Sequence, residues 1–330
     1  MWLQYRLISA AGNRISATCW ADTATIIGNL LSEGSWTRIR EPNKQYLPQA
    51  ALDVDRWQSG KICGKSSHYP GQKWLWMPSG MYHKFEVSDY CKIIRGRNVL
   101  IVGDSLSNQF TSTFISMLWR NKQQLNLTEN EFHCAFRGYC PGRISINCLG
   151  DAPPFNITFV RNFYLSLCDG INYTLPRYEN PWIGRIKDEN ISIVIMNRGA
   201  HNASSSSLVE EMNATLHHLT VHYPTVLFIF RDTPSGHPHC EETLTSEPLQ
   251  VAKFNYSSLA EHQKGWGWAL FEQQNHRVHD LIRAHYPWVI YLNVSFSTAL
   301  RADSHHLPPT DCLHYCWVGA TVGATRIAIR

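Results

Sequence analysis

The stretch that decides the fold is NVLIVGDSLSNQF, residues 98–110. Val99–Val102 is a continuous apolar run rich in β-branched residues, which is typical of a strand that is covered on both faces. The run ends abruptly in Gly103, Asp104 and Ser105, and the helical pattern FTSTFISMLWR follows. A buried strand that passes through a short polar turn into a helix is the repeating unit of an α/β fold.

Comparable strands and helices alternate along the rest of the chain. Further continuous apolar runs predict strands at 191–197, 225–231 and 288–294, and FNITFVRNFYL predicts an edge strand at 155–165. Helical spacing of apolar residues predicts helices at 106–120, 208–222 and 268–285, the second with a capping box of Ser207 and Glu210. The pattern predicts a mainly parallel sheet flanked by helices.

The first 92 residues have a different texture, with little periodicity and scattered glycine, proline and tryptophan. We expect an irregular N-terminal segment at 1–92, pinned by Cys63 and Cys91, and a catalytic domain at 93–330. The 330 residues, of which 44% are apolar, are enough to bury a full core. The formal charge of +4 is small for this length, so it indicates no nucleic-acid partner.

Cysteines and glycosylation sequons together favour the secretory pathway. The ten cysteines include no C-x-x-C pair, which favours disulfides over a zinc ribbon. Chance predicts about three Asn-x-Ser/Thr sequons, but the chain has eight, which favours contact with the glycosylation machinery. The eight asparagines are Asn126, Asn156, Asn172, Asn190, Asn202, Asn213, Asn255 and Asn293.

The start of the chain does not show the segment that a secretory route requires. MWLQYRLISAAGNRIS lacks the apolar core of a signal peptide, and no run reaches the roughly 18 apolar residues that span a bilayer. The alternatives are an incomplete N-terminus and an unusual route of entry, and we expect the first. Membrane anchoring would then depend on a segment that precedes Met1.

Ser105 is the first candidate for chemistry. In an open parallel sheet, active sites lie beyond the carboxyl ends of the strands, and the amides of the following helix can stabilise an oxyanion there. The serine would be the nucleophile that attacks an acyl group. The alternative is that Ser105 merely caps the helix, because serine and aspartate are both good caps.

A base for the serine is available near the end of the chain, in DCLHYC. Asp311 and His314 are three residues apart, and on a turn or a helix start this spacing turns both side chains to one side. Asp311 would orient the imidazole while His314 accepts the serine proton. Asp303 and His306 form a rival pair with the same spacing. Two flanking cysteines, Cys312 and Cys316, distinguish the first pair, because we expect both to form disulfides that hold the loop rigid.

These segments, taken in order, resemble the PC-esterase group of SGNH (GDSL-like) acyl enzymes. The similarity is closest to the trichome-birefringence-like polysaccharide O-acetyltransferases of plants, and it covers roughly residues 57–319. The segments that carry it are GDSLSNQ, DCLHYC, WLWMPSG (74–80), MNRGAHN (196–202), FRDTPSGHPHC (230–240) and LNVSFSTALRADSHH (292–306).

The resemblance implies a role for each site residue. Ser105 is then the nucleophile, His314 the base and Asp311 the residue that orients it. The oxyanion hole is made by the backbone amide of Ser105, the side chain of Asn197 and a glycine. An amide donor such as that of Asn197 suits this role chemically, although an asparagine at a strand end can also be a cap. Three glycines lie in the right interval, and the choice stays open among Gly138, Gly142 and Gly150.

The resemblance also implies an O-acetyltransferase that acts on a glycan or polysaccharide hydroxyl through an acyl-serine intermediate. It implies no bound cofactor, an acetyl donor as co-substrate, and a location in the Golgi lumen, with secretion as the alternative. A carbohydrate acetylesterase with the same triad and an inactive glycan-binding relative are the other hypotheses. The intact Ser105, Asp311 and His314 count against the inactive form.

The chain departs from the plant enzymes at several positions. Those enzymes usually carry arginine in place of Ser107, cysteine in place of Met81 and tryptophan in place of Tyr315, and the similarity ends after Gly319. The acceptor of the plant enzymes is therefore not assumed for this chain.

A zinc site is an alternative for GHPHC, in which His237, His239 and Cys240 offer three soft ligands. A fourth ligand is not evident, so we expect no metal.

Overall fold

The structure is a computed structural model of the chain. It describes residues 34–38, 74–78, 87–119, 125–127, 142–148, 152–167, 179–201, 207–240, 267–307 and 311–315. The central sheet and the helices that cover it lie within these ranges.

A seven-stranded sheet forms the centre of the described part of the chain, in the order β4-β5-β6-β3-β7-β8-β9. Five of its strands are parallel, and β4 and β5 are antiparallel additions beside β6. Counted along the chain, the five parallel strands lie in the flavodoxin-like order 2-1-3-4-5. The strands are β3 (Asn98–Gly103), β4 (Leu125–Leu127), β5 (Gly142–Cys148), β6 (Phe155–Arg161), β7 (Ile191–Met196), β8 (Leu227–Arg231) and β9 (Ile290–Leu292).

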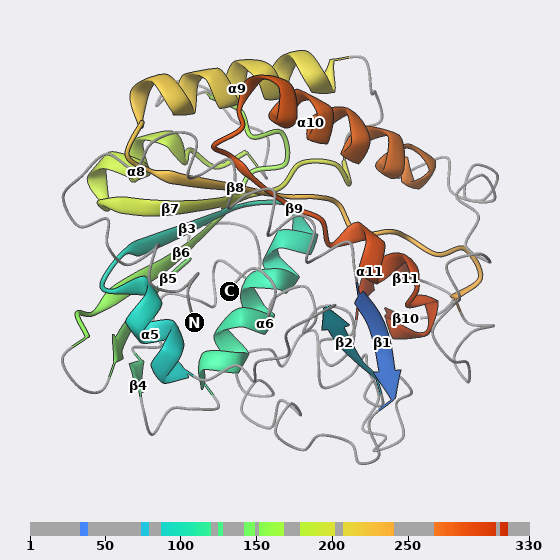
Figure 1. Cartoon of the computed structure of the whole chain (residues 1–330), viewed down its shortest axis with the longest axis horizontal. Helices are drawn as coiled ribbons and strands as arrows, with labels where there is room; N and C mark the ends of the chain where they lie inside the picture. Colours follow the sequence, from blue (N-terminus) through green and yellow to red (C-terminus); the bar gives the residue numbers. More distant parts are fainter. Residues whose placement is uncertain are drawn as a thin grey trace.

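Helices cover both faces of the sheet (Figure 1). On one face lie α5 (Val87–Ile94) and α6 (Ser105–Trp119), and on the other lie α8 (Ile183–Asp188), α9 (Leu208–His222) and α10 (Phe271–His285). Alternate residues of β3 enter the two cores: Val99 and Ile101 pack with α5 and α6, whereas Leu100 and Val102 pack with the other three helices. This explains why the strand is apolar throughout. The predicted α/β fold with a mainly parallel sheet is confirmed.

Two small antiparallel sheets complete the described strands. One pairs β1 (Gly34–Arg38) with β2 (Trp74–Pro78), and the other pairs β10 (His305–Leu307) with β11 (Asp311–Tyr315). Between β9 and β10 lie α11 (Ser295–Ala299) and a 3₁₀ turn, Ala302–Ser304, and a second 3₁₀ turn, Trp268–Leu270, precedes α10.

The predicted helices at 106–120, 208–222 and 268–285 are confirmed to within a few residues, and so are the four continuous apolar strands. The prediction of an edge strand at 155–165 is half wrong, because β6 lies inside the sheet between β3 and β5. The predicted capping box is also wrong, because Ser207 makes no side-chain cap hydrogen bond to α9.

Two disulfides join described residues: Cys91 to Cys148 and Cys240 to Cys312. Cys91 therefore ties α5 to the end of β5 and does not pair with Cys63, which lies outside the described residues. The boundary that the sequence predicts between residues 92 and 93 falls within α5, and the division into two parts stays a prediction. None of the described helices is long and apolar enough to cross a membrane.

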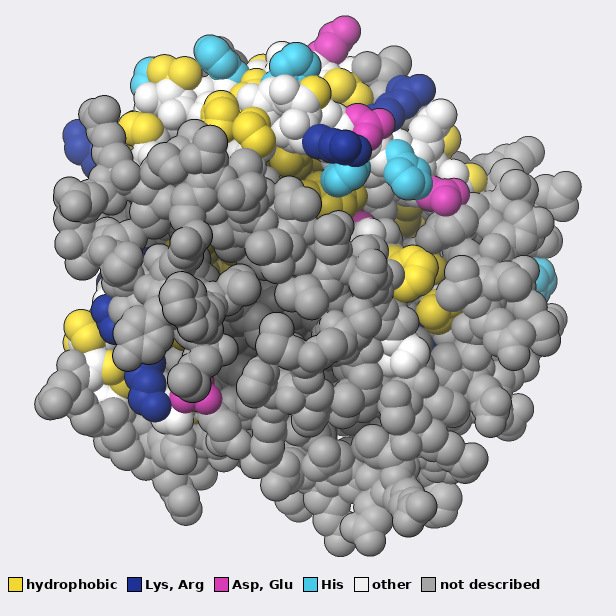
Figure 2. Space-filling model, in the orientation of Figure 1, with side chains coloured by type: hydrophobic (Ala, Val, Ile, Leu, Met, Phe, Trp, Pro, Cys, Tyr) yellow, Lys and Arg dark blue, Asp and Glu magenta, His cyan; other side chains and the backbone are white. Residues whose placement is uncertain are grey.

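A groove runs between α9 and α10, where hydrophobic and histidine side chains gather on the surface (Figure 2). Its lining includes Val221, Trp288 and the two histidines His217 and His285. None of the predicted triad residues lines this groove.

Candidate active site

The carboxyl end of β3 is the switch point of the sheet. The chain leaves β3 for α6 on one face, whereas the helices between later strands pack on the other face. Ligands of open α/β sheets bind at such a point. Gly103 is the last residue of β3. A Cβ at this position would lie 2.2 Å from the Oγ of Ser107, so only glycine permits this close approach of strand and helix. Ser105 follows as the first residue of α6.

Asp104, not Ser105, caps α6 with its side chain. Its buried Oδ1 accepts hydrogen bonds from the backbone amides of Leu106 at 2.9 Å and Ser107 at 3.2 Å. This leaves the Ser105 hydroxyl available for another contact. The Ser105 amide has no backbone acceptor among the described residues, and it lies at the positive end of α6.

The structure brings Ser105, His314 and Asp311 together in a hydrogen-bonded chain. His314 Nε2 lies 2.8 Å from Ser105 Oγ, and His314 Nδ1 lies 2.8 Å from Asp311 Oδ2. A carboxylate accepts at Nδ1, so this nitrogen carries the proton and Nε2 presents its lone pair to the serine. The side chains of Asp311 and His314 are 25% and 24% exposed. The site is therefore open to solvent on one side.

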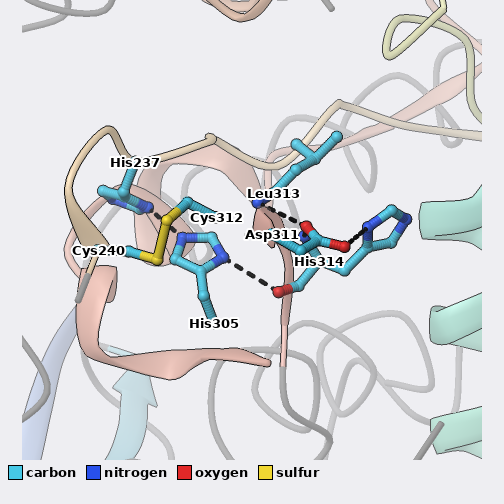
Figure 3. The surroundings of a disulfide bond; sticks show 7 residues. All are labelled: His237, Cys240, His305, Asp311, Cys312, Leu313 and His314. Atoms are coloured by element: carbon cyan, nitrogen blue, oxygen red, sulfur yellow. Dashed lines mark hydrogen bonds and ion pairs between the residues drawn. A yellow bond between two sulfur atoms is a disulfide. The ribbon is translucent and has the colours of Figure 1, made fainter. Parts of the chain in front are cut away.

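The spacing of Asp311 and His314 predicts a turn or a helix start. The structure places both residues on strand β11 instead (Figure 3). In a regular strand, residues three apart point to opposite faces. The pairing of β10 with β11 is irregular, because His305 lies opposite Tyr315 but Leu307 lies opposite Asp311. The two extra residues of β11 bulge, and the bulge turns both side chains to one side. Asp311 Oδ1 stabilises the bend by accepting from the amides of Leu313 and His314 at 3.1 and 3.0 Å.

Gln109 links the helix that carries Ser105 to the strand that carries His314. Its buried side chain spans from α6 to β11, where Nε2 donates to the Tyr315 carbonyl at 2.9 Å and Oε1 accepts from the Tyr315 amide at 3.2 Å. Ser105 lies one helical turn before Gln109, and His314 directly precedes Tyr315. Sequence reasoning missed this residue.

Of the rival pair, the structure describes only the side chain of Asp303. The Asp303 carboxylate is buried and binds the Arg301 guanidinium through hydrogen bonds of 2.8 and 3.0 Å. The side chain of His306 lies outside the described residues. Asp311 instead lies against His314, and His314 in turn reaches Ser105.

The predicted oxyanion residues that the structure describes, other than Ser105 itself, are not hydrogen-bonded to Ser105 as the triad histidine is. Asn197 directly follows β7, but its Nδ2 donates to the Arg231 carbonyl at 2.9 Å and to Thr233 Oγ1 at 3.1 Å. Both amide hydrogens are thus engaged away from Ser105 in this conformation. Gly142 begins β5 opposite Phe159, and β6 separates it from β3. Gly138 and Gly150 lie outside the described residues, so the choice of glycine stays open.

A buried guanidinium balances charge at the start of α6. Arg231 Nη2 donates to Ser107 Oγ at 3.1 Å, and its charge interacts with the buried carboxylates of Asp104 and Asp232. Burial lowers the pKa of Arg231, while the two carboxylates raise it. Although Ser107 stands where the plant enzymes usually have arginine, a guanidinium still lies beside the first turn of α6.

His201 is a further residue of the site that sequence reasoning did not single out. Its ring stacks on Phe163 with centroids 3.9 Å apart. Burial lowers its pKa, Asp104 opposes this, and the charges of Arg161 and His314 lower it further. His201 is therefore a neutral imidazole close to the triad at neutral pH.

The Cys240–Cys312 disulfide joins β11 to the segment that follows β8 (Figure 3). Cys312 follows Asp311 directly, and its carbonyl accepts from the His237 amide at 2.9 Å. Cys312 is thus in a disulfide, whereas Cys316 lies outside the described residues. The disulfide removes Cys240 from the alternative zinc site, and no group of three metal-ligating side chains occurs in the described part of the chain.

No protein-family model matches the sequence, and no curated protein matches it. Among solved structures, the chain is similar to a carbohydrate esterase family 2 enzyme with a carbohydrate binding domain from Corynascus thermopiles (Myceliophthora fergusii). The identity is 9%, the match covers 77% of this chain and 67% of that chain, and the TM-score is 0.37. It is also similar to the periplasmic domain of a lipopolysaccharide acetyltransferase from Salmonella ser. Paratyphi A, with 10% identity, coverage of 86% and 94%, and a TM-score of 0.39.

Proposed function

We propose that the chain is a serine-dependent acyl enzyme that uses Ser105, His314 and Asp311. The observation that carries the proposal is the contact of 2.8 Å between His314 Nε2 and Ser105 Oγ, with Asp311 at the other nitrogen. A nucleophile, its base and a group that orients the base are thereby within hydrogen-bond reach of one another.

The proposed reaction has two halves. His314 Nε2 takes the Ser105 proton as Oγ attacks the acyl carbon, and the carbonyl oxygen becomes an oxyanion beside the Ser105 amide. The imidazolium, stabilised by Asp311, gives its proton to the leaving group, and an acyl-serine remains. In the second half His314 deprotonates an acceptor hydroxyl, which attacks the acyl carbon, and the proton returns to Ser105.

The acceptor that we propose is a hydroxyl group of a glycan or polysaccharide, and the acyl group is acetyl. This finer assignment is supported by the resemblance of the ordered motifs to plant polysaccharide O-acetyltransferases. A bound sugar hydroxyl has a large effective concentration and can outcompete water for the acyl-serine. The acetyl donor is a co-substrate, and we assign no bound cofactor.

Hydrolysis is the second candidate. The partial exposure of His314 and Asp311 favours it, because water can reach the acyl-serine as it forms. The same triad would then act as a carbohydrate acetylesterase.

Two disulfides between described residues support an oxidising compartment. We propose the lumen of the secretory pathway, and within it the Golgi, where glycan acceptors are available.

The test is acetylation of the purified protein by an activated acetyl ester, followed by mass spectrometry of the peptide that contains Ser105. The wild type should carry acetyl on Ser105 and Ser105→Ala should not, whereas Ser145→Ala, which removes a hydroxyl on β5, should react normally. An unmodified Ser105, or normal turnover by Ser105→Ala, would refute the proposal.

The choice of base is tested by two variants. His314→Ala should lower kcat by several orders of magnitude, about 10³-fold or more, in the range of triad knockouts. His306→Ala should lower it far less, and equal losses would mean that the base is misassigned.

Transfer and hydrolysis are separated by the fate of the acetyl group. With oligosaccharide acceptors present, transfer predicts that acetylated oligosaccharide accumulates faster than free acetate. If free acetate dominates with every acceptor and acetylated glycans lose their acetyl groups, the protein is an esterase.

A further inference from the structure

Two buried imidazoles, those of His237 and His305, meet behind the base (Figure 3). His237 Nδ1 lies 2.7 Å from His305 Nε2. The outer nitrogen of each ring faces a backbone carbonyl: His237 Nε2 lies 2.8 Å from that of Ala299, and His305 Nδ1 lies 3.1 Å from that of His314. The pair thus connects the end of α11 with the residue that carries the proposed base.

These three contacts need three protons. A carbonyl oxygen only accepts, so each outer nitrogen must carry a proton. Two neutral imidazoles have one proton each, and both would then be on the outer nitrogens. The inner nitrogens would face each other with lone pairs at 2.7 Å, which is repulsive. Any neutral combination of tautomers leaves at least one of the three contacts without a proton.

We propose that His237 and His305 share one additional proton, and that this charged pair is a positioning element for His314. The shared proton follows from the geometry alone, whereas the positioning role rests on the proposed function. The ring that donates to the His314 carbonyl is part of a cation, and a charge-assisted hydrogen bond is stronger than one between neutral groups. The pair thereby holds the bulge of β11 at the His314 carbonyl, next to the Tyr315 backbone that Gln109 binds.

The charges around the pair fit one added proton. Arg301 and Asp303 neutralise each other through two hydrogen bonds. The remaining carboxylate, Asp311, interacts with His305 and is balanced by the shared proton.

Burial opposes any added charge on the pair. Burial lowers the pKa of His237 to about 4, opposed by the Ala299 carbonyl and Asp303. Burial and the charges of His237 and His314 lower the pKa of His305, while the His314 carbonyl and Asp311 raise it. Both shifts favour neutral rings, so the shared proton requires that the three hydrogen bonds of the pair offset the cost of burying its charge. The Tyr315 ring, with its centroid 4.4 Å from that of His305, covers the pair.

The shared proton is tested by nuclear magnetic resonance on the full chain labelled with ¹⁵N-histidine. We expect three protonated nitrogens among the four, and a scalar coupling between His237 Nδ1 and His305 Nε2 across their N–H···N bond. His237→Gln and His305→Gln should each remove this coupling and so assign it. Only two protonated nitrogens among the four, with or without the coupling, would overturn the inference, whatever the activity of the protein.

The positioning role is tested by two neutral replacements of His305. The side-chain amide of His305→Asn lies where Nδ1 was and can still donate to the His314 carbonyl, whereas that of His305→Gln lies where Nε2 was and cannot. We expect kcat to fall about 100-fold in His305→Gln but only about tenfold in His305→Asn, with KM unchanged in both.

Equal losses in the two variants, at equal folded fractions, would mean that His305 only fills space and would refute the positioning role. Wild-type protein that shows three protonated nitrogens but no acyl chemistry would refute the proposed function and not the shared proton.

Discussion

Gln109→Met should separate the stability of the fold from the alignment of the triad. Methionine has the length of glutamine but cannot replace the hydrogen bonds of 2.9 and 3.2 Å to the Tyr315 backbone. At about 0.5–1.5 kcal/mol for each bond, the free energy of unfolding should fall by about 1–3 kcal/mol. β11 would then shift relative to α6 and carry His314 away from Ser105. A displacement of about 1 Å lowers the rate of a positioned reaction about 100-fold.

The rate at which a fluorophosphonate labels Ser105 measures this alignment without knowledge of the natural substrate. Thr111→Val is the matched control, because Thr111 is buried on α6 and its hydroxyl binds only within the helix, at 2.8 Å to the Ser107 carbonyl. The control should lose about 1 kcal/mol of stability and label normally. If Gln109→Met also labels Ser105 at the wild-type rate once both are fully folded, Gln109 does not align the triad.

Buried groups give two further predictions. Removing the Cys240–Cys312 disulfide by double alanine substitution should slow labelling of the serine, whereas removing Cys91–Cys148 should not. Their sequence separations of 72 and 57 predict similar stability losses of about 4 kcal/mol, measured by urea unfolding. Burial raises the pKa of Asp232 from 3.8 to about 6, so between these pH values the folded state binds more protons and the free energy of unfolding falls as pH rises, by about 3 kcal/mol. Asp232→Asn should lack this decline, and an unchanged pH profile would refute it.

The parallel strands could be predicted from the sequence because strands covered on both faces are apolar at every position. β5 was not predicted, because it is antiparallel and alternates: Ile144 and Ile146 point into the core, whereas Arg143 is exposed. This strand pairs with β6 and converts the expected edge strand into an interior one. The alternation in GRISINC was the signal that could have found it.

The pair of Asp311 and His314 could be predicted from spacing, but the reason for their alignment could not. The bulge in β11 depends on its pairing with β10, and no local pattern reports that pairing. Gln109 lies 206 residues from its partner, and His237 lies 68 residues from His305. Such contacts are set by the sheet topology. The sequence alone does not distinguish a glutamine or histidine that is buried from one that is exposed.

Asn197 shows how a correctly placed residue can still leave its role open. The sequence puts it at the end of the strand beside β3, but both amide hydrogens bind Arg231 and Thr233. Turning the amide toward Ser105 would break two hydrogen bonds, at a cost of about 1–3 kcal/mol. One oxyanion donor stabilises a transition state by about 2.7–4 kcal/mol. If Asn197 is an oxyanion donor as the resemblance implies, its rotation would be favourable only while an oxyanion is present, and in the proposed mechanism the Ser105 amide at the start of α6 would be the first donor.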